Sequence, residues 1–270
     1  MGKSEGNREL KSPAQVYDEL FVPALFRQWA GVVADEAGVS NGDEVLDVAC
    51  GTGVLACEAG RRAGDARVVG LVPNDDMLCV ARRKNPAIDW RPGRAEALPF
   101  ADASFDCVVS QFGLMFFEDR AAGLREMLRV LRPGGRLAIA VCDALDHSPG
   151  YAVLAELLQR LFGQPVADAF RAPFALGDVT QLRTLCEQAG VADTGIVRRD
   201  GTVRFDSIDR LVGTERACVW TLGGLLDEPQ FERLRAAANE SLAPFVGADG
   251  AVQFVMPALI VRAIRRTARR

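Results

Sequence analysis

A glycine-rich turn between two regular segments constrains the fold of this chain most. The stretch EVLDVACGTGVLACEAGRRA, residues 44–63, places Cys50-Gly51-Thr52-Gly53 between an apolar run and a run of helix formers. Residues 44–49 have the continuous apolar character of a buried parallel strand. Residues 54–63 favour a helix. A strand, a glycine turn and a helix in this order present bare backbone and a helix N-terminus to a ligand, which indicates a nucleotide-type site.

Strands and helices alternate downstream of this turn. Further strands are predicted at 67–72, 88–91, 105–110 and 136–142, and helices at 75–84 and 118–131. This alternation predicts right-handed crossovers and an α/β fold with a doubly wound, mostly parallel sheet. Ligands of such sheets bind outside the carboxyl ends of the strands, at the point where the strand order reverses.

The flanking segments predict helical caps around the sheet. Ser12 and Pro13 open a short helix, and a second helix is expected to start at Pro23 because proline does not fit a helix interior. Helices are predicted within 149–174, 179–190 and 207–245, and strands at 194–205 and 251–264. We expect one domain over 1–270: an N-terminal helical cap (1–40), a cofactor-binding core (41–142), a helical insertion (143–178) and the rest of the sheet with a helical insertion (179–270).

Charge and composition exclude several classes of function. The 270 residues carry a net charge of -4, so no basic field covers the chain, and we expect no nucleic-acid partner. The N-terminus is polar and no long apolar run is present, which predicts neither a signal peptide nor membrane insertion. Seven scattered cysteines without a C-x-x-C pair favour reduced thiols in a cytoplasmic protein. We predict no metal, and a site for metal or arsenic built from three cysteines is the minor alternative.

The order of several short motifs resembles a known enzyme family. DVACGTG is followed by VVGLVPNDDML, GRAEALPFADASFD, VVSQ and LREMLRVLRPGGRL, over about residues 43–141. This series resembles the class I S-adenosylmethionine-dependent methyltransferases, and within them the branch that includes quinone-biosynthesis methyltransferases. The resemblance implies a Rossmann-like methyltransferase fold and S-adenosyl-L-methionine as the cofactor, with S-adenosyl-L-homocysteine as its product. The rest of the chain resembles the variable caps of that family only loosely.

The resemblance also assigns the cofactor site. Backbone groups of Ala49, Cys50 and Gly51 would meet the amino-acid end of the cofactor, and Asp47 would order the turn. Met77 would pack on the adenine, with an ordinary core methionine as the alternative. The expected cofactor-binding residues are Asp47, Ala49, Cys50, Gly51, Gly53, Val72, Pro73, Met77, Arg94, Ala95, Glu96 and Gln111.

Two positions depart from the family pattern. An acidic residue that binds the ribose is expected about 20 residues past the glycine turn, at the end of the second strand, and that place is Val72. Losing two charge-assisted hydrogen bonds predicts cofactor binding weaker by about 10² to 10⁴-fold. Asp75 and Asp76 lie nearby, but they also fit the first turn of a helix. Arg94 stands where many relatives place an aspartate, and it would either stack on the adenine or lie solvated in a loop.

The chemistry points to a small apolar acceptor. Methyl transfer is an in-line displacement, so positioning supplies most of the catalysis, and a base helps only if the acceptor must lose a proton. His147, with Asp143 beside it, is the candidate base, and an exposed loop histidine is the alternative. An aromatic lining suits a small hydrophobic molecule. The candidate substrate residues are Tyr17, Phe21, Phe112, Met115, Phe116 and Tyr151, which core packing could equally explain.

We therefore predict S-adenosylmethionine-dependent methyl transfer to O, N or C of a small, apolar or aromatic molecule. The alternative follows from Val72, which stands in place of the ribose-binding acid. It is a protein of methyltransferase fold that has lost methyl transfer and acts as a cyclase-type catalyst or binding protein. A third reading is a nicotinamide-dependent oxidoreductase, because Gly51-x-Gly53-x-x-Ala56 fits the loose dinucleotide fingerprint. Val72 weakens that hypothesis too, because a nicotinamide cofactor needs the same carboxylate. The sequence indicates neither the acceptor nor the oligomeric state.

Overall fold

The protein is built around one seven-stranded sheet. The computed structural model describes residues 12–191, 194–218 and 220–266. The strand order is β3-β2-β1-β4-β5-β9-β6. Strands β3, β2, β1, β4 and β5 are parallel, and β9 runs antiparallel to both β5 and β6. The strands are β1 (Val45–Val48), β2 (Val68–Leu71), β3 (Asp89–Arg91), β4 (Phe105–Gln111), β5 (Leu131–Cys142), β6 (Gly195–Arg199) and β9 (Ala258–Ile264). The predicted doubly wound, mostly parallel α/β fold is confirmed.

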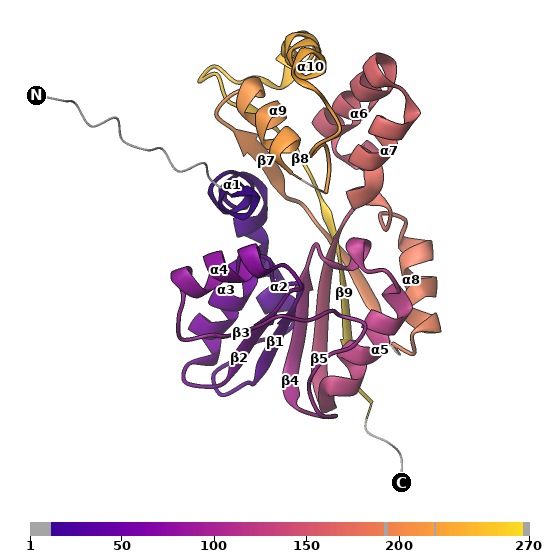
Figure 1. Ribbon diagram of the computed structural model, residues 1–270. Helices are drawn as coiled ribbons and strands as arrows, with labels where there is room; N and C mark the ends of the chain where they lie inside the picture. The colour runs from indigo at the N-terminus through magenta and orange to yellow at the C-terminus, as the bar shows by residue number, and fades with distance from the viewer. Residues whose placement is uncertain (1–11, 192–193, 219, 267–270) are drawn as a thin grey trace, which may run out of the picture.

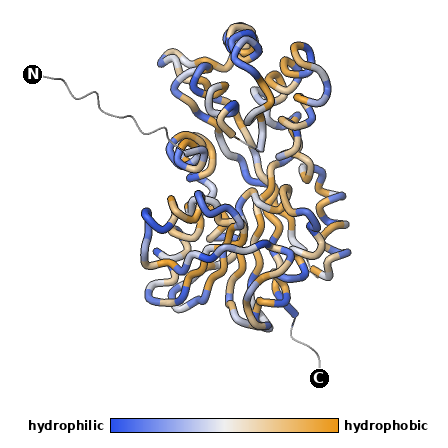
Figure 2. Tube along the Cα trace, viewed as in Figure 1, coloured by the Kyte–Doolittle hydropathy of each residue, from blue (hydrophilic) through white to orange (hydrophobic). Residues whose placement is uncertain are grey.

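Helices cover both faces of this sheet (Figure 1). The chain moves from β1 to β2 in one direction along the sheet and from β4 to β5 in the other. Right-handed crossovers therefore place α3 (Val54–Ala63) and α5 (Arg120–Val130) on opposite faces. The remaining sheet-covering helices are α2 (Arg27–Glu36), α4 (Asp75–Lys84) and α8 (Val179–Gln188). The strands between these layers are the apolar centre of the lower half of the molecule (Figure 2).

The N-terminal helices form one continuous rod. α1 (Pro13–Val16) begins with a capping box in which the Ser12 hydroxyl accepts from the Gln15 amide. It continues without a break into η1 (Tyr17–Phe26), a π-helix, and then into α2. The expected start of a helix at Pro23 is wrong, because Pro23 lies inside η1. In a π-helix each N–H donates to the carbonyl five residues earlier, and Pro23, which has no N–H, leaves out one of these bonds without ending the helix.

A second lobe stands over the carboxyl ends of the strands (Figure 1). It contains α6 (Pro149–Phe162), α7 (Gln164–Arg171), α9 (Ile208–Ala217), α10 (Glu228–Ser241) and a two-stranded sheet of β7 (Thr202–Phe205) with β8 (Val252–Val255). The predicted single strands at 194–205 and 251–264 are therefore each divided between two sheets. Each division falls at a two-residue break between strands, Asp200-Gly201 in the first and Met256-Pro257 in the second. The predicted helical caps thus include a small β-ribbon.

The strand β5 also begins earlier than expected. It starts at Leu131 rather than at position 136, and it absorbs the Pro133-Gly134-Gly135 segment. Gly134 has a φ of +82°, and the register of β4 against β5 shifts between Phe105 and Cys107. The predicted turn is therefore an irregularity within the strand, at the edge of the sheet opposite the second lobe.

Candidate functional site

A cavity of about 320 Å³ lies between the carboxyl ends of the strands and the second lobe. The turn after β1 contributes Ala49 and Gly51, the end of β2 contributes Val72, and the end of β4 contributes Gln111. Neighbours β1 and β4 are the strands between which the sheet order reverses. The cavity therefore occupies the place at which doubly wound sheets bind their ligands.

The glycine turn after β1 has positive backbone φ angles where it meets the cavity. Ala49, Gly51 and Gly53 have φ values of +61°, +55° and +87°. Such conformations are strained for residues with a side chain and concentrate at functional sites. Gly53 precedes α3 as its N-cap without a side-chain cap. A Cβ atom at Gly53 would lie 2.3 Å from the Trp90 ring, so this position has room for glycine alone.

Asp47 is a buried carboxyl group directly beneath this turn. Its side chain is 1% exposed, and neither of its oxygens has a hydrogen-bond partner among the described residues. Burial raises the pKa of Asp47 to about 8, and the nearby Ala56 amide offsets only part of that rise. Buried polar groups normally have partners, so an orphaned carboxyl at a ligand-binding edge fits a cationic or hydrogen-donating ligand.

Most of the predicted cofactor residues line the cavity: Ala49, Gly51, Val72, Pro73, Met77, Arg94, Ala95, Glu96 and Gln111. Asp47, Cys50 and Gly53 do not line it and lie behind the turn. The Cys50 amide donates to the Leu71 carbonyl and the Gly53 amide to the Cys50 carbonyl, so both are already bonded. Met77 is buried in the core and also lines the cavity, so its packing on the adenine stays a prediction.

The place expected for a ribose-binding acid holds no carboxylate. Val72 lines the cavity and is 7% exposed. Asp75 and Asp76 are exposed in the first turn of α4 and do not line the cavity. Their position is the one that helix stabilisation alone explains.

The loop after β3 carries the second departure from the family pattern. Arg94 pairs with Glu118 at 2.7 Å, and its side chain is 51% exposed. The Glu96 carboxylate accepts from the Glu118 amide at 2.8 Å. Both side chains therefore close this loop against the start of α5, although both residues also line the cavity. An exposed ion pair of this kind adds little stability.

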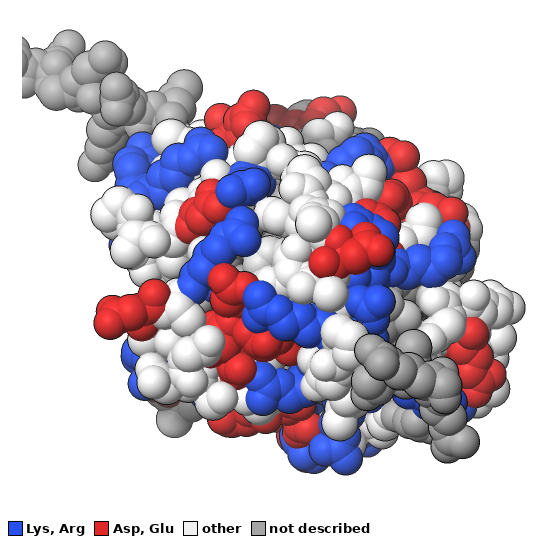
Figure 3. Space-filling view, turned by 90° about the horizontal axis from the view of Figure 1, so that it is seen from below, with Lys and Arg blue, Asp and Glu red and all other residues white. Residues whose placement is uncertain are grey.

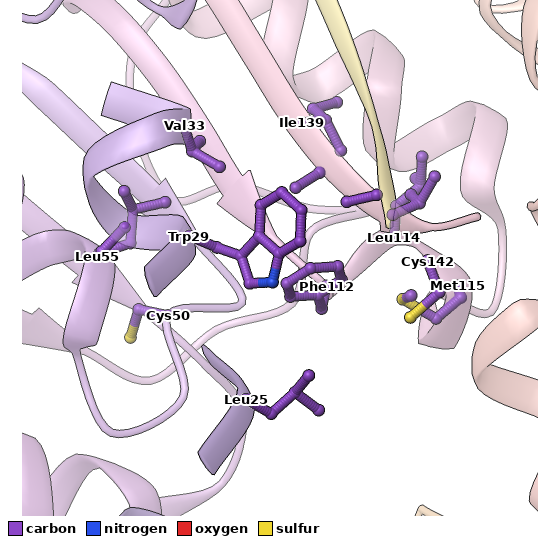
Figure 4. Packing of buried hydrophobic residues seen from close by; sticks show 14 of the residues in the cluster. Leu25, Trp29, Val33, Cys50, Leu55, Phe112, Leu114, Met115, Ile139 and Cys142 are labelled. Atoms are coloured by element: carbon purple, nitrogen blue, oxygen red, sulfur yellow. The ribbon is translucent and has the colours of Figure 1, made fainter. Parts of the chain in front are cut away.

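Aromatic rings surround the rest of the cavity. All six predicted substrate residues line it: Tyr17, Phe21, Phe112, Met115, Phe116 and Tyr151. Tyr17 stacks on Phe26 at 5.4 Å between ring centroids and meets Trp220 edge-on at 5.8 Å. Phe112 packs edge-on against Trp29 (Figure 4). Several of these rings are thus both core and lining, which is why the sequence could not separate the two roles.

The sequence reasoning missed Trp220, Met256 and Glu215, which all line the cavity. Phe170 and Phe174, from the helical segment predicted within 149–174, line it as well. Glu215 could have been found: it continues the buried stripe Ile208, Leu211 and Val212 of α9 at helical spacing. A carboxylate at an apolar position of an amphipathic helix indicates an unusual buried acid, which residue composition alone does not show.

His147 and Asp143 lie away from the cavity lining. The Asp143 carboxylate meets Arg198 at 2.8 Å and the His147 Nδ1 at 2.9 Å, and it also accepts from the Ala144 amide. This cluster joins the end of β5 to β6. The position of the two residues therefore gives no support to the expectation that either acts as a base at the site.

The described part of the chain shows neither a metal site nor a membrane-spanning helix. Over residues 12–191, 194–218 and 220–266, no three His, Cys, Asp or Glu side chains are arranged to hold a metal ion. None of the helices within these ranges has the length and apolar character needed to cross a membrane.

Comparison with known proteins places the core among methyltransferases. The sequence profile described as "Methyltransferase domain" matches residues 46–139. Demethylmenaquinone methyltransferase of Renibacterium salmoninarum is 43% identical over 134 residues, covering 50% of this chain and 56% of that protein. Ubiquinone/menaquinone biosynthesis C-methyltransferase UbiE of Hahella chejuensis is 42% identical over 200 residues, covering 67% of this chain and 80% of that protein. Against several such relatives the chain spans only about half of their length.

Solved structures share the fold. Phosphoethanolamine N-methyltransferase 2 of Haemonchus contortus, in complex with S-adenosylhomocysteine, has a TM-score of 0.60 at 15% identity, covering 96% of this chain and 59% of that one. The [4+2]-cyclase SpnF has a TM-score of 0.55 at 18% identity, covering 93% of this chain and 96% of that one. Likeness at these identities establishes the fold alone.

Proposed function

The chain belongs to the class I S-adenosylmethionine-dependent methyltransferases, and from that premise we propose that it transfers a methyl group from S-adenosylmethionine to a small aromatic acceptor. The related proteins are named for methylation in quinone biosynthesis, which favours a quinone-type ring and a carbon as the methylated atom. The observation that carries the proposal is the orphaned Asp47 carboxyl beneath an open glycine turn at the reversal point of the sheet.

The residues present fit this cofactor. Bound there, it supplies a methyl group on a positively charged sulfur. Ala49 and Gly51 of the turn line the cavity and would present their backbone to its amino-acid end, and Asp47, which lies behind the turn, would order that backbone. Met77 and Ala95 line the same cavity and would pack on the adenine. Gln111 lines the same cavity with its Oε1 unpartnered, while its amide nitrogen donates to the Phe26 carbonyl at 3.0 Å.

The aromatic half of the cavity positions the acceptor. Tyr17, Phe112 and Tyr151 supply flat apolar walls, and burial among them excludes water from the reacting atoms. Residues from η1, the sheet and the second lobe all line this one cavity. For this reason we propose that the whole chain works as a single methyltransferase domain.

A small molecule fits this protein better than a nucleic acid. On the face shown in Figure 3, basic and acidic side chains interleave rather than forming one basic field. Arg136 pairs with Asp43 at 2.6 Å and Arg262 with Glu36 at 3.3 Å, so acidic partners balance the charge of these arginines. The seven cysteines are free, which supports a reducing, cytoplasmic location.

Restoring the ribose-binding acid is expected to tighten cofactor binding. In Val72→Asp, the new carboxylate at the end of β2 would face the cavity, and one charge-assisted hydrogen bond, of the two that a ribose-binding acid could form, is worth roughly 1.5–3 kcal/mol. We expect the dissociation constant of S-adenosylhomocysteine, measured by calorimetry, to fall by about 10- to 100-fold. Asp75→Asn is the control and should leave the constant unchanged. Weaker binding by Asp75→Asn, with no gain in Val72→Asp, would show that the exposed acid already holds the ribose.

Methyl transfer itself is tested with labelled cofactor. The protein is incubated with methyl-labelled S-adenosylmethionine and a panel of quinols, naphthols and phenols, and label is counted in the organic extract. Label in the extract supports the proposal. Val72 favours the second candidate, a non-methylating catalyst or binding protein, which would bind the cofactor weakly and leave every acceptor unlabelled.

A further inference from the structure

The wall of the cavity contains a buried carboxyl group from a residue that is not among the predicted cofactor-binding residues. Glu215 on α9 is 2% exposed, lines the cavity, and has no hydrogen-bond partner for its Oε2. Within the described ranges no arginine or lysine forms an ion pair with it. Burying a carboxylate without a cation is costly, so folding alone does not explain a glutamate on the apolar stripe of α9.

The groups around Glu215 offer it hydrogen bonds but no positive charge. The Tyr151 hydroxyl of α6 donates to the carboxylate, and the Thr221 hydroxyl lies 3.0 Å from the Glu215 backbone carbonyl. Cys218 is the other titratable group beside it. Burial raises the pKa of Glu215 to about 7, with Thr221 and Tyr151 lowering it in part. The carboxyl group therefore exists in both protonation states near neutral pH.

Glu215 lies on the acceptor side of the cavity. The second lobe, which carries it, also contributes the rings of Tyr151, Phe170 and Phe174, with Tyr151 centred 5.7 Å from Phe170 and 5.9 Å from Phe174. The glycine turn and Val72, on the sheet, form the cofactor side. A flat aromatic molecule enclosed by these rings would present its polar substituent to the Glu215 carboxyl group.

We propose that Glu215 binds the hydroxyl group of an aromatic acceptor and takes its proton during methyl transfer. The inference rests on the proposed function and extends it to a catalytic residue. Glu215 accepts the proton, and the acceptor keeps the electron pair of the broken O–H bond. That charge supports bond formation to the methyl carbon, from the oxygen or from a ring carbon, while the carbon–sulfur bond breaks and its electron pair stays on sulfur. A ring carbon then loses its own proton to water.

The test compares a hydroxylated aromatic with its methyl ether. Binding of naphthol and of methoxynaphthalene is measured by calorimetry with S-adenosylhomocysteine present. We expect the natural protein to prefer naphthol by about tenfold or more, because one hydrogen bond to a charged group is at stake. Glu215→Leu should lose that preference. Glu228→Gln, on the surface of α10 where Glu228 pairs with Arg216, is the control and should keep it.

A second variant separates binding from proton transfer. Glu215→Gln still accepts a hydrogen bond but no proton, so it should keep most of the preference for naphthol. Its rate of methylating the hydroxylated acceptors of the panel should fall by about 10² to 10⁴-fold.

Three results overturn the inference: equal binding of naphthol and its ether by the natural protein, a preference that survives in Glu215→Leu, or full methylation by Glu215→Gln. Binding of S-adenosylhomocysteine without methylation of any hydroxylated aromatic overturns it too. If S-adenosylhomocysteine itself does not bind, the failure lies with the proposed function instead.

Discussion

Replacing Asp47 by asparagine is expected to stabilise the ligand-free protein at alkaline pH while weakening its binding of the cofactor. The pKa of Asp47 rises from an ordinary 3.8 to about 8 on folding. A carboxyl group with a raised pKa favours folding only while it is protonated, so its contribution is complete below about pH 4 and is lost as the pH rises through 8. The full shift corresponds to roughly 6 kcal/mol of unfolding free energy above pH 8.

Asparagine at position 47 carries no charge and removes this dependence. We expect Asp47→Asn to exceed the natural protein in unfolding free energy by several kcal/mol at pH 8 and to differ little at pH 4, by urea denaturation. Its dissociation constant for S-adenosylmethionine should rise by about 10- to 100-fold, because the buried carboxyl group that orders the glycine turn is lost.

Asp106 provides the matched control for Asp47. It lies on β4, and its carboxylate accepts from Arg132 and from the Glu44 amide, contacts that lower its pKa although burial opposes them. Asp106→Asn should therefore destabilise the protein at neutral pH, and cofactor binding should not change. Equal stability of Asp47→Asn and the natural protein at pH 8 would show that Asp47 has a partner or reaches solvent.

Substituting Gly53 by alanine is expected to damage both the fold and the site. The new Cβ would lie 2.3 Å from the Trp90 ring, and the φ of +87° is strained for any residue with a side chain. Backbone strain of about 1–2 kcal/mol and overpacking of about 1–3 kcal/mol act together, so we expect a loss of roughly 2–5 kcal/mol in unfolding free energy. The turn must also shift, which should remove measurable binding of S-adenosylhomocysteine.

Gly42 separates the two causes. Its φ is +90°, but nothing lies within 4 Å of the position that a Cβ would take. Gly42→Ala should therefore cost only the backbone strain, about 1–2 kcal/mol, and leave cofactor binding unchanged. If Gly53→Ala costs no more than Gly42→Ala in thermal or urea denaturation, the close approach of Trp90 is not what requires glycine.

The sequence was most informative where local signals agree. The helices at 54–63 and 75–84 have the predicted bounds, because a glycine turn starts the first and Asn74 caps the second through the Met77 amide. Each strand around the switch point is a short apolar run between turns, so the apolar pattern and the turn residues predicted the same strands. The positions of the lining residues near the strand ends follow from that topology.

Local sequence signals could not predict which strands far apart in the sequence pair with each other. Residues 202–205 pair with 252–255 rather than extending the main sheet, and nothing local distinguishes these two partners. Proline usually ends a helix, but Pro23 lies inside the π-helical segment η1, which the local sequence did not indicate. Glu215 was missed since its importance depends on burial, which only the packing of α9 against the rest of the lobe reveals.

Calorimetric titration of the natural protein with S-adenosylhomocysteine, and in parallel with NADH, tests the central claim most directly. The claim is that the backbone of the glycine turn, with Asp47 beneath it, holds an adenosyl cofactor. We expect S-adenosylhomocysteine to bind with one site per chain, with NADH showing no heat of binding. Binding of NADH in place of S-adenosylhomocysteine, or of neither, would contradict the account.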